Sequence, residues 1–164
     1  MRLSITQAHH LVFSLLFFPV LLFAHKNKQQ VATWYFGPQY GLDFSSGQPE
    51  LLYDSAMPTY EAASTVSDQS GNLLFYSNGG GREDGTAQGA IWNRNHEVME
   101  GGDLGTLMGG GYSAAQGCIS LPKPGTTEEY YLFTVDEFEA LQNDQTQFPL
   151  GKGLSYFEID LSAN

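Results

Sequence analysis

The 164-residue sequence predicts an all-β protein, and three observations lead to this prediction. A pattern of apolar strand, polar glycine-containing turn and aromatic strand occurs twice, over residues 62–76 and 117–133. Glycine is abundant, with 19 residues, and phenylalanine and tyrosine number 11 and 9. Outside residues 1–24 no segment shows convincing helical periodicity. Glycine-bounded aromatic strands of this kind are typical of all-β proteins with many turns.

The repeat also predicts an architecture. Each of the two units is followed by a further strand-like run, at residues 90–93 and 154–161. Units of three or four strands spaced by roughly 50 residues are the sequence mark of propeller blades. We therefore expect a partial β-propeller of about two blades, with their sheets stacked face to face. Because only three residues follow the last strand, we expect the chain to be a fragment of a longer protein.

Residues 1–24 predict a secretory signal peptide. Arg2 gives a basic start, residues 11–23 form an apolar run, and Ala24 is small enough to precede a cleavage point. A membrane-spanning helix needs about 20 apolar residues, and this run is shorter. A retained N-terminal anchor is the alternative. Residues 25–164 would then form the incomplete propeller region of a secreted or surface-displayed protein, with no membrane insertion of the mature chain.

The strand signals begin soon after the signal peptide. Residues 31–36 are β-branched and aromatic and predict a strand, and residues 42–44 predict a short extended piece. Residues 48–60 contain two prolines and are interpreted as a loop or an edge strand. Residues 62–68 and 73–76 form the first repeated unit. Its paired aromatic residues should point to opposite faces of the sheet.

Two glycine-rich connections separate the remaining strands. Residues 77–85 contain three consecutive glycines followed by charges, which predicts a mobile exposed loop. Residues 92–99 predict a strand, a tight polar turn and a short return strand, and residues 101–111 a second glycine-rich connection. After the second unit, residues 137–150 break the strand pattern and are interpreted as an inserted loop.

Charge and cysteine content exclude several function classes. Arg2 is the only charged residue of 1–24, so cleavage changes the net charge from −11 to −12. Such an acidic surface repels phosphate backbones, which argues against nucleic acid and anionic membranes as partners. Cys118 is the single cysteine, so no intrachain disulfide is possible. Its apolar strand predicts a small buried hydrophobic residue rather than a nucleophile.

Most of the mature chain resembles a known family. It is similar to the N-terminal propeller-like region of large exported proteins of Bacteroidetes-type bacteria, labelled gliding motility-associated or type IX secretion cargo. The matching pieces, in chain order, are 34–37 (WYFG), 41–44 (GLDF), 67–68 (SD), 71–76 (GNLLFY), 91–96 (IWNRNH), 98–99 (VM), 121–125 (LPKPG), 130–136 (YYLFTVD) and 153–156 (GLSY).

The resemblance implies a secreted or surface-displayed protein with a β-propeller region, and it implies no reaction or shared catalytic residue. The sequence departs from the family in two ways. The loop 79–89 looks longer than usual, and the C-terminal sorting domain is absent. The secretion route is therefore implied only for a parent polypeptide.

Few residues suggest chemistry. Residues 68–72 superficially resemble a calcium loop but lack its ligand spacing, so a hairpin turn held by Asp68 or Asn72 is the better interpretation. The best candidates for a contact loop are three charged residues on the glycine stem, Arg82, Glu83 and Asp84, although a solvated loop tip is the simpler interpretation. No metal ligand and no cofactor site is predicted.

A polar and aromatic cluster follows the first unit. Trp92 is expected in the core, and Asn93 and His96 are expected to fix the turn between two strands. A single histidine without a partner carboxylate is poor evidence for catalysis or zinc binding.

The functional expectation is a non-enzymatic module that recognises extracellular glycan or protein through loops on a rigid scaffold. The alternative is a propeller-type glycoside hydrolase or lyase that uses loop carboxylates, for which Asp43, Glu61 and Asp136 lie at or near strand ends. A calcium-dependent adhesive domain is the third possibility.

Overall fold

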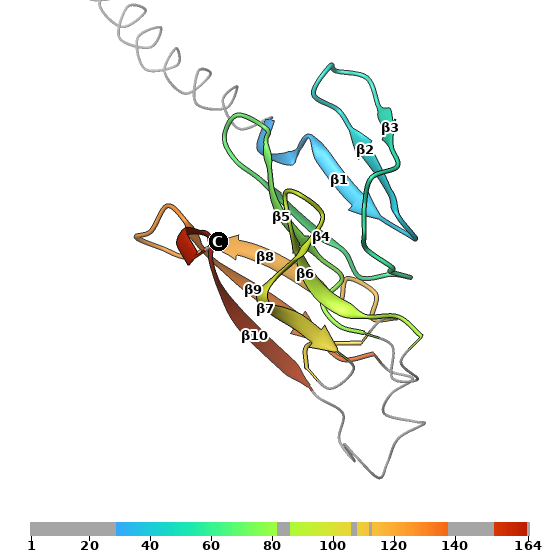
Figure 1. Cartoon of the computed structure of the whole chain (residues 1–164), viewed down its shortest axis with the longest axis vertical. Helices are drawn as coiled ribbons and strands as arrows, with labels where there is room; N and C mark the ends of the chain where they lie inside the picture. Colours follow the sequence, from blue (N-terminus) through green and yellow to red (C-terminus); the bar gives the residue numbers. More distant parts are fainter. Residues whose placement is uncertain (1–28, 82–85, 106–107, 112, 138–152, 164) are drawn as a thin grey trace, which may run out of the picture.

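The protein folds into three small antiparallel β-sheets, as a computed structural model shows (Figure 1). The structure describes residues 29–81, 86–105, 108–111, 113–137 and 153–163. The all-β prediction is confirmed, because the only helices in these ranges are two 3-10 turns, η1 (Gln29–Val31) and η2 (Leu161–Ala163). None of the described helices is long and apolar enough to cross a membrane.

Each sheet is built from strands consecutive in the chain. The first sheet contains β1 (Thr33–Phe36), β2 (Tyr40–Asp43) and β3 (Glu50–Leu52). The middle sheet contains β4 (Ser64–Ser67), β5 (Leu73–Ser77), β6 (Gly89–Asn93) and β7 (Val98–Gly105). The third sheet contains β8 (Cys118–Pro122), β9 (Glu129–Val135) and β10 (Leu154–Asp160), in the order β10-β9-β8.

The two repeated units are the hairpins β4–β5 and β8–β9, as the sequence predicts. The edge strand expected within 48–60 is β3. The sequence identifies only two units, whereas the structure has one more sheet, the first sheet, which precedes both units in the chain. Its strands are three or four residues long, too short for an alternation of apolar and polar residues to stand out.

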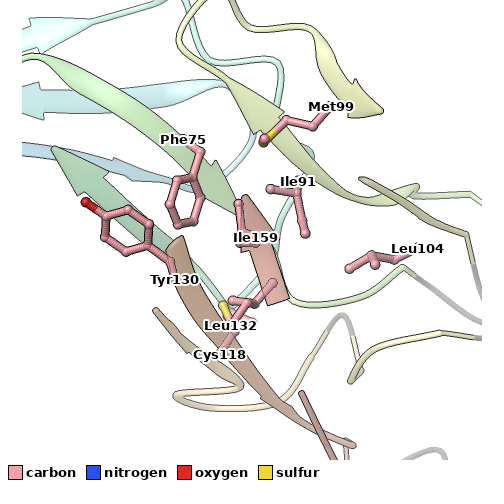
Figure 2. Packing of buried hydrophobic residues seen from close by; sticks show 9 residues of the cluster. Phe75, Ile91, Met99, Leu104, Cys118, Tyr130, Leu132 and Ile159 are labelled. Atoms are coloured by element: carbon pink, nitrogen blue, oxygen red, sulfur yellow. The ribbon is translucent and has the colours of Figure 1, made fainter. Parts of the chain in front are cut away.

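The middle sheet is covered on both faces. On one face, core residues of the middle sheet pack against those of the third sheet, and Figure 2 shows this shared cluster: Phe75, Ile91, Met99, Leu104, Cys118, Tyr130, Leu132 and Ile159. On the other face, Tyr76, Ala90 and Trp92 pack against Tyr35 of the first sheet and Met57. The expectation that Phe75 and Tyr76 point to opposite faces is therefore confirmed. Tyr76 lies opposite Trp92, with ring centroids 5.5 Å apart and planes at 14°.

The sheets approach each other along their first strands. Between β1 and β4, the Tyr35 amide donates to the Thr65 hydroxyl at 2.9 Å. Between β4 and β8, the Ser120 amide donates to the Ser64 hydroxyl at 3.0 Å, and the two serine hydroxyls lie 2.8 Å apart. Hydroxyls of β4 thus bond to the backbone of β1 in the first sheet and to the backbone of β8 in the third sheet.

The glycine-rich connections pack closely at one end of the middle sheet. This corrects the expectation of a mobile exposed loop for residues 77–81 of the predicted 77–85, and residues 82–85 lie outside the described residues. Residues 79–81 are buried, as are residues 109–111. Gly80 and Gly109 form an isolated β-bridge, and the Gly110 amide donates to the Gly79 carbonyl at 2.7 Å. Side chains at these positions would keep the two backbones apart, so the glycines allow the two segments to pack closely rather than to move freely.

The expectation of a second glycine-rich connection over 101–111 is also partly wrong, because β7 continues to Gly105. Two register shifts in the β6–β7 pairing accommodate the glycines within a strand. The predicted signal peptide, 1–24, and most of the predicted inserted loop lie outside the described residues.

The two outer faces of the stack are apolar. On the first sheet they expose Trp34, Phe36, Tyr40 and Leu51. On the third sheet they expose Ile119, Leu121, Val135, Leu154 and Tyr156, of which Leu154 and Tyr156 are 71% and 62% exposed. Tyr131, Phe133 and Tyr156 form a ring cluster there, with centroids 5.9 to 6.1 Å apart. Exposed apolar side chains gathered on one face are typical of interaction surfaces.

Candidate functional site

The turn at 68–72 is a self-contained hydrogen-bonded unit, as the sequence predicts. Asp68 Oδ1 accepts from the amides of Ser70 and Asn72 at 2.7 and 2.9 Å, and Asp68 Oδ2 accepts from Asn72 Nδ2 at 2.8 Å. The Asn72 side chain, followed by these amides, lowers the pKa of the Asp68 carboxyl below its ordinary value. Both carboxylate oxygens are used within the turn, so the calcium interpretation gains no support from its geometry.

The turn between β6 and β7 uses the same device. Asn93 Oδ1 accepts from the amides of Asn95 and Glu97 at 2.8 and 3.1 Å, which confirms that Asn93 fixes this turn. His96 adopts a left-handed conformation, with φ 64°. Histidine is among the few residue types that are enriched there. This conformation directs the imidazole back towards the middle sheet.

His96 belongs to a polar network between the first and middle sheets, which we call the seam network: Tyr35, Asp54, Tyr76 and His96. Tyr76 Oη lies 3.1 Å from His96 Nδ1, and His96 Nε2 lies 3.6 Å from Asp54 Oδ2. Tyr35 Oη donates to Asp54 Oδ1 at 3.0 Å. The network is satisfied when Tyr76 donates to Nδ1 and the Nε2 proton faces Asp54.

Sequence reasoning treats His96 as a histidine without a partner, and the structure supplies one in Asp54. The two residues are 42 positions apart, so no local pattern joins them. Asp54 lies just after the edge strand β3, in a segment with prolines and no periodicity. Only the stacking of the first sheet on the middle sheet brings its carboxylate to the imidazole.

The seam network joins a loop segment to the middle sheet. Tyr76 is fully buried, and its hydroxyl also accepts from the Ala56 amide at 3.0 Å. Burial is the main cause that raises the pKa of Tyr76, and burial together with the hydrogen bond to Asp54 raises that of Tyr35. Phenols whose pKa is raised keep their protons and cannot act as nucleophiles near neutral pH. The network therefore fastens the segment around 54–56 to the middle sheet.

The three carboxylates considered for glycoside chemistry fall in separate segments. Asp43 ends β2, and its two oxygens accept from the Ser45 amide and hydroxyl, both at 2.8 Å. Glu61 lies exposed in the loop before β4. Asp136 follows β9 and accepts from the Glu137 amide at 3.0 Å. The candidate contact residues Arg82, Glu83 and Asp84 lie outside the described residues.

Cys118 is buried, as predicted. Its thiol donates to the Ser77 carbonyl at 3.6 Å, and burial raises the pKa of the thiol to about 12. A thiol with this pKa is inert near neutral pH. Within the described ranges no group of three or more His, Cys, Asp or Glu side chains is placed to hold a metal ion.

The described part of the chain contains hollows at the contacts between sheets. One, of about 440 Å³, lies between the edge strands β7 and β10 and is lined by Ile91, Met99, Glu100, Gly101, Gly102, Phe157, Glu158, Ile159, Asp160 and Ala163. The other, of about 300 Å³, lies between β1 and β4 and is lined by Trp34, Tyr35, Phe36, Ala63 and Thr65. Neither was evident from the sequence, because each combines residues of two sheets.

No protein-family model, curated protein or solved structure matches this chain. The geometry of the described residues is thus the main basis for assigning a role.

Proposed function

We propose that this chain is a non-enzymatic recognition module of β-propeller type, exported from the cell and displayed at or beyond its surface. The stacking of consecutive sheets carries the proposal. The first strands β1, β4 and β8 lie next to one another in chain order, and hydroxyls of β4 link to the backbones on both sides. Sheets that meet along their first strands in chain order are arranged as neighbouring blades are around an axis.

The apolar outer faces support the same proposal. In a propeller every blade packs a neighbour on both faces, and the middle sheet already does so through its two core clusters. The outer faces of the first and third sheets carry the same kinds of aromatic and aliphatic side chains. We infer that the outer face of the third sheet receives a further sheet in the parent protein.

Recognition is favoured over catalysis by the state of the polar groups. Asp43 and Asp68 are engaged in their own turns, and in the described part of the chain the histidine–carboxylate pair His96–Asp54 contacts the buried Tyr76 hydroxyl. The aromatic hollow between β1 and β4 instead offers a half-open surface with the exposed Trp34 beside it. Aromatic side chains with a polar atom are suited to contacts that are partly apolar and partly wet.

The test compares binding with turnover. The full chain is incubated with a panel of extracellular polysaccharides and immobilised extracellular proteins, and both retention of the chain and release of reducing ends are measured. We expect retention without release. Trp34→Ala should weaken retention, whereas Tyr53→Ala, on an exposed aromatic outside the hollow, should leave it unchanged.

The hydrolase or lyase alternative makes the opposite prediction. Release of reducing ends that disappears when Asp43, Glu61 and Asp136 are replaced by alanine would refute the non-enzymatic role. Release that persists in this triple variant would refute it as well, and would move the search for catalytic groups elsewhere in the chain.

A further inference from the structure

The seam network contains an imidazole and a carboxylate at a spacing that suits a metal ion. His96 Nε2 lies 3.6 Å from Asp54 Oδ2, which is longer than a direct hydrogen bond of about 2.7 to 3.2 Å. Nitrogen and oxygen ligands of one zinc ion, each about 2.0 to 2.2 Å from it, lie roughly 3.3 to 3.5 Å apart at tetrahedral angles. The two donor atoms are therefore close to the positions that a single ion requires.

Buried tyrosines orient both of these side chains through their other polar atom. Tyr76 Oη lies 3.1 Å from His96 Nδ1, and Tyr35 Oη donates to Asp54 Oδ1 at 3.0 Å. Both tyrosines are buried. Outer partners of this kind fix the direction of metal ligands, and their loss typically weakens metal binding by about 10- to 100-fold. The pair is thus oriented before an ion binds.

The hydrogen bonds of the network also permit the proton arrangement that a metal requires. A ligating histidine offers the lone pair of Nε2 and carries its proton on Nδ1. Nδ1–H then donates to Tyr76 Oη, which still accepts from the Ala56 amide at 3.0 Å. The Tyr76 proton turns to the Ser55 hydroxyl, the side chain that also interacts with this phenol. Each of these polar groups therefore keeps a partner.

The exposure of the pair determines how tightly an ion is held. The side chains of His96 and Asp54 are 25% and 54% exposed, so an ion can reach them with part of its water shell. The described residues place no third His, Cys, Asp or Glu side chain at this point. Water therefore completes the coordination, and binding is weaker than at a structural site with four protein ligands.

The ligand types define the class of ion. Imidazole suits zinc, copper and nickel, whereas calcium and magnesium take oxygen ligands only. The net charge of −11 attracts cations to the molecule as a whole, but this field does not distinguish one divalent ion from another. Selectivity for a zinc-type ion therefore depends on His96.

We propose that Asp54 and His96 bind a divalent transition-metal ion of the zinc type, which joins the segment after β3 to the turn between β6 and β7. The sequence argues against zinc at His96 because it shows no partner carboxylate, and the structure supplies that carboxylate in Asp54. An ion held from both sides stabilises the contact between the first and middle sheets. This role is independent of the proposed recognition function, because it requires neither glycan nor protein.

The experiment measures Zn²⁺ binding to the full chain with His96 as its single histidine. The sequence has four histidines, and the other three, His9, His10 and His25, lie outside the described residues. They are replaced by glutamine throughout. The chain is freed of metal with a chelator that is then removed. Zn²⁺ is added while the imidazole ¹⁵N signals and the midpoint of thermal unfolding are recorded.

We expect Zn²⁺ to shift the Nε2 signal of His96 and to raise the unfolding midpoint, because an ion that binds only the folded chain stabilises it. Ca²⁺ at the same concentration should produce neither change. His96→Gln should abolish the rise in the midpoint. The imidazole signal is read on the chain with both ligands intact, so it does not depend on the folding of a ligand variant.

A pair of matched variants tests the carboxylate. Asp54→Asn should weaken Zn²⁺ binding by about tenfold or more, since loss of a ligand should cost at least as much as loss of an outer partner. Asp103→Asn makes the same change at an exposed carboxylate of β7 and should alter the affinity by less than about twofold, because distant surface charges are largely screened at about 0.15 M salt.

An unchanged imidazole signal in excess Zn²⁺, or coordination through Nδ1, would overturn the inference. Equal affinities of the Asp54→Asn and Asp103→Asn chains would also overturn it, because they would show attraction by overall charge alone. An equal rise in the midpoint with Ca²⁺ would lead to the same conclusion. These outcomes leave the retention assay for the recognition role untouched, so the two proposals fail separately.

Discussion

Asp68 and Asn93 show how single residues define the turns of this fold. Each side-chain oxygen accepts two backbone amides at the start of a hairpin turn, two and four residues further along the chain. These amides would otherwise be without partners where the strands end. Because every atom of the device lies within five consecutive residues, both turns can be predicted from the sequence.

Replacement of Asp68 by alanine should lower the midpoint of thermal unfolding, and the loss should depend on pH. The pKa of Asp68 is lowered in the folded state, so its contribution is present above the ordinary carboxyl pKa and disappears as pH falls through the folded value. Thermal scans of the native and Asp68→Ala chains at a series of acidic pH values should therefore converge. A gap that persists at the lowest pH would contradict this assignment.

The same turn makes a prediction about calcium. Since the oxygens of Asp68 are already occupied within the turn, the unfolding midpoint should be the same in calcium and in chelator. A rise in the midpoint with calcium would support the adhesive-domain alternative. Scanning calorimetry of the full chain suffices for this comparison.

Tyr76 contributes to stability through its hydroxyl as well as its ring. Tyr76→Phe keeps the stacked ring but removes the acceptor of the Ala56 amide and the partner of His96. We expect a loss of about 1 to 3 kcal/mol in the free energy of unfolding, because buried polar groups are left unsatisfied. Tyr53→Phe, on an exposed tyrosine, is the matched control and should change little. Urea unfolding of both variants gives the comparison.

At the scale of elements, the glycine triplets 79–81 and 109–111 allow the two connections to pack directly against each other. A Cβ at Gly80 would overlap the Gly110 carbonyl, and the backbone on both sides is fixed by the β-bridge to Gly109. Sequence reasoning interprets such triplets as exposed and mobile, because flexibility is the usual reason for consecutive glycines. The close approach of two distant segments is a second reason, and it is visible only in three dimensions.

Gly80→Ala should accordingly destabilise the fold by about 2 kcal/mol or more, as expected for overpacking against a rigid backbone. Gly125→Ala provides the control: its φ is +87°, but nothing lies within 4 Å of its added Cβ, so it carries only the conformational penalty of about 1 kcal/mol. Denaturant unfolding should rank Gly80→Ala as the more damaging change. Equal losses would mean that conformation, not contact, selects glycine at position 80.

The sheets also differ in how far they can be predicted from the sequence. The aromatic hairpins β4–β5 and β8–β9 are predictable because apolar residues and turn signals alternate over a dozen residues or more. The strands of the first sheet are predicted singly, but their assembly into a separate sheet is not, because it depends on packing against the middle sheet, as Tyr35 against Tyr76 illustrates with ring centroids 4.8 Å apart.

At the scale of the whole molecule, we expect the exposed apolar outer faces of the first and third sheets to promote self-association. Leu154 and Tyr156 lie on the outer face of the third sheet and contribute little to its inner core. A double variant Leu154→Lys/Tyr156→Lys should change the free energy of unfolding by no more than about 1 kcal/mol, yet reduce self-association and binding of an apolar dye. Analytical ultracentrifugation and dye fluorescence of the full chain test this. A large loss of stability would show that this face is part of the core.

The sequence by itself determined the all-β class, the two aromatic hairpins, the turns at Asp68 and Asn93 and the burial of Cys118. Each of these depends on residues within a few positions of one another, where hydrogen bonding and alternation act locally. The tertiary structure alone decided that Asp54 reaches His96, that the glycine triplets pack together, and that β7 and β10 line a common hollow. These features join segments about 30 to 60 residues apart, and the stacking of the sheets, rather than any local pattern, sets which side chains meet.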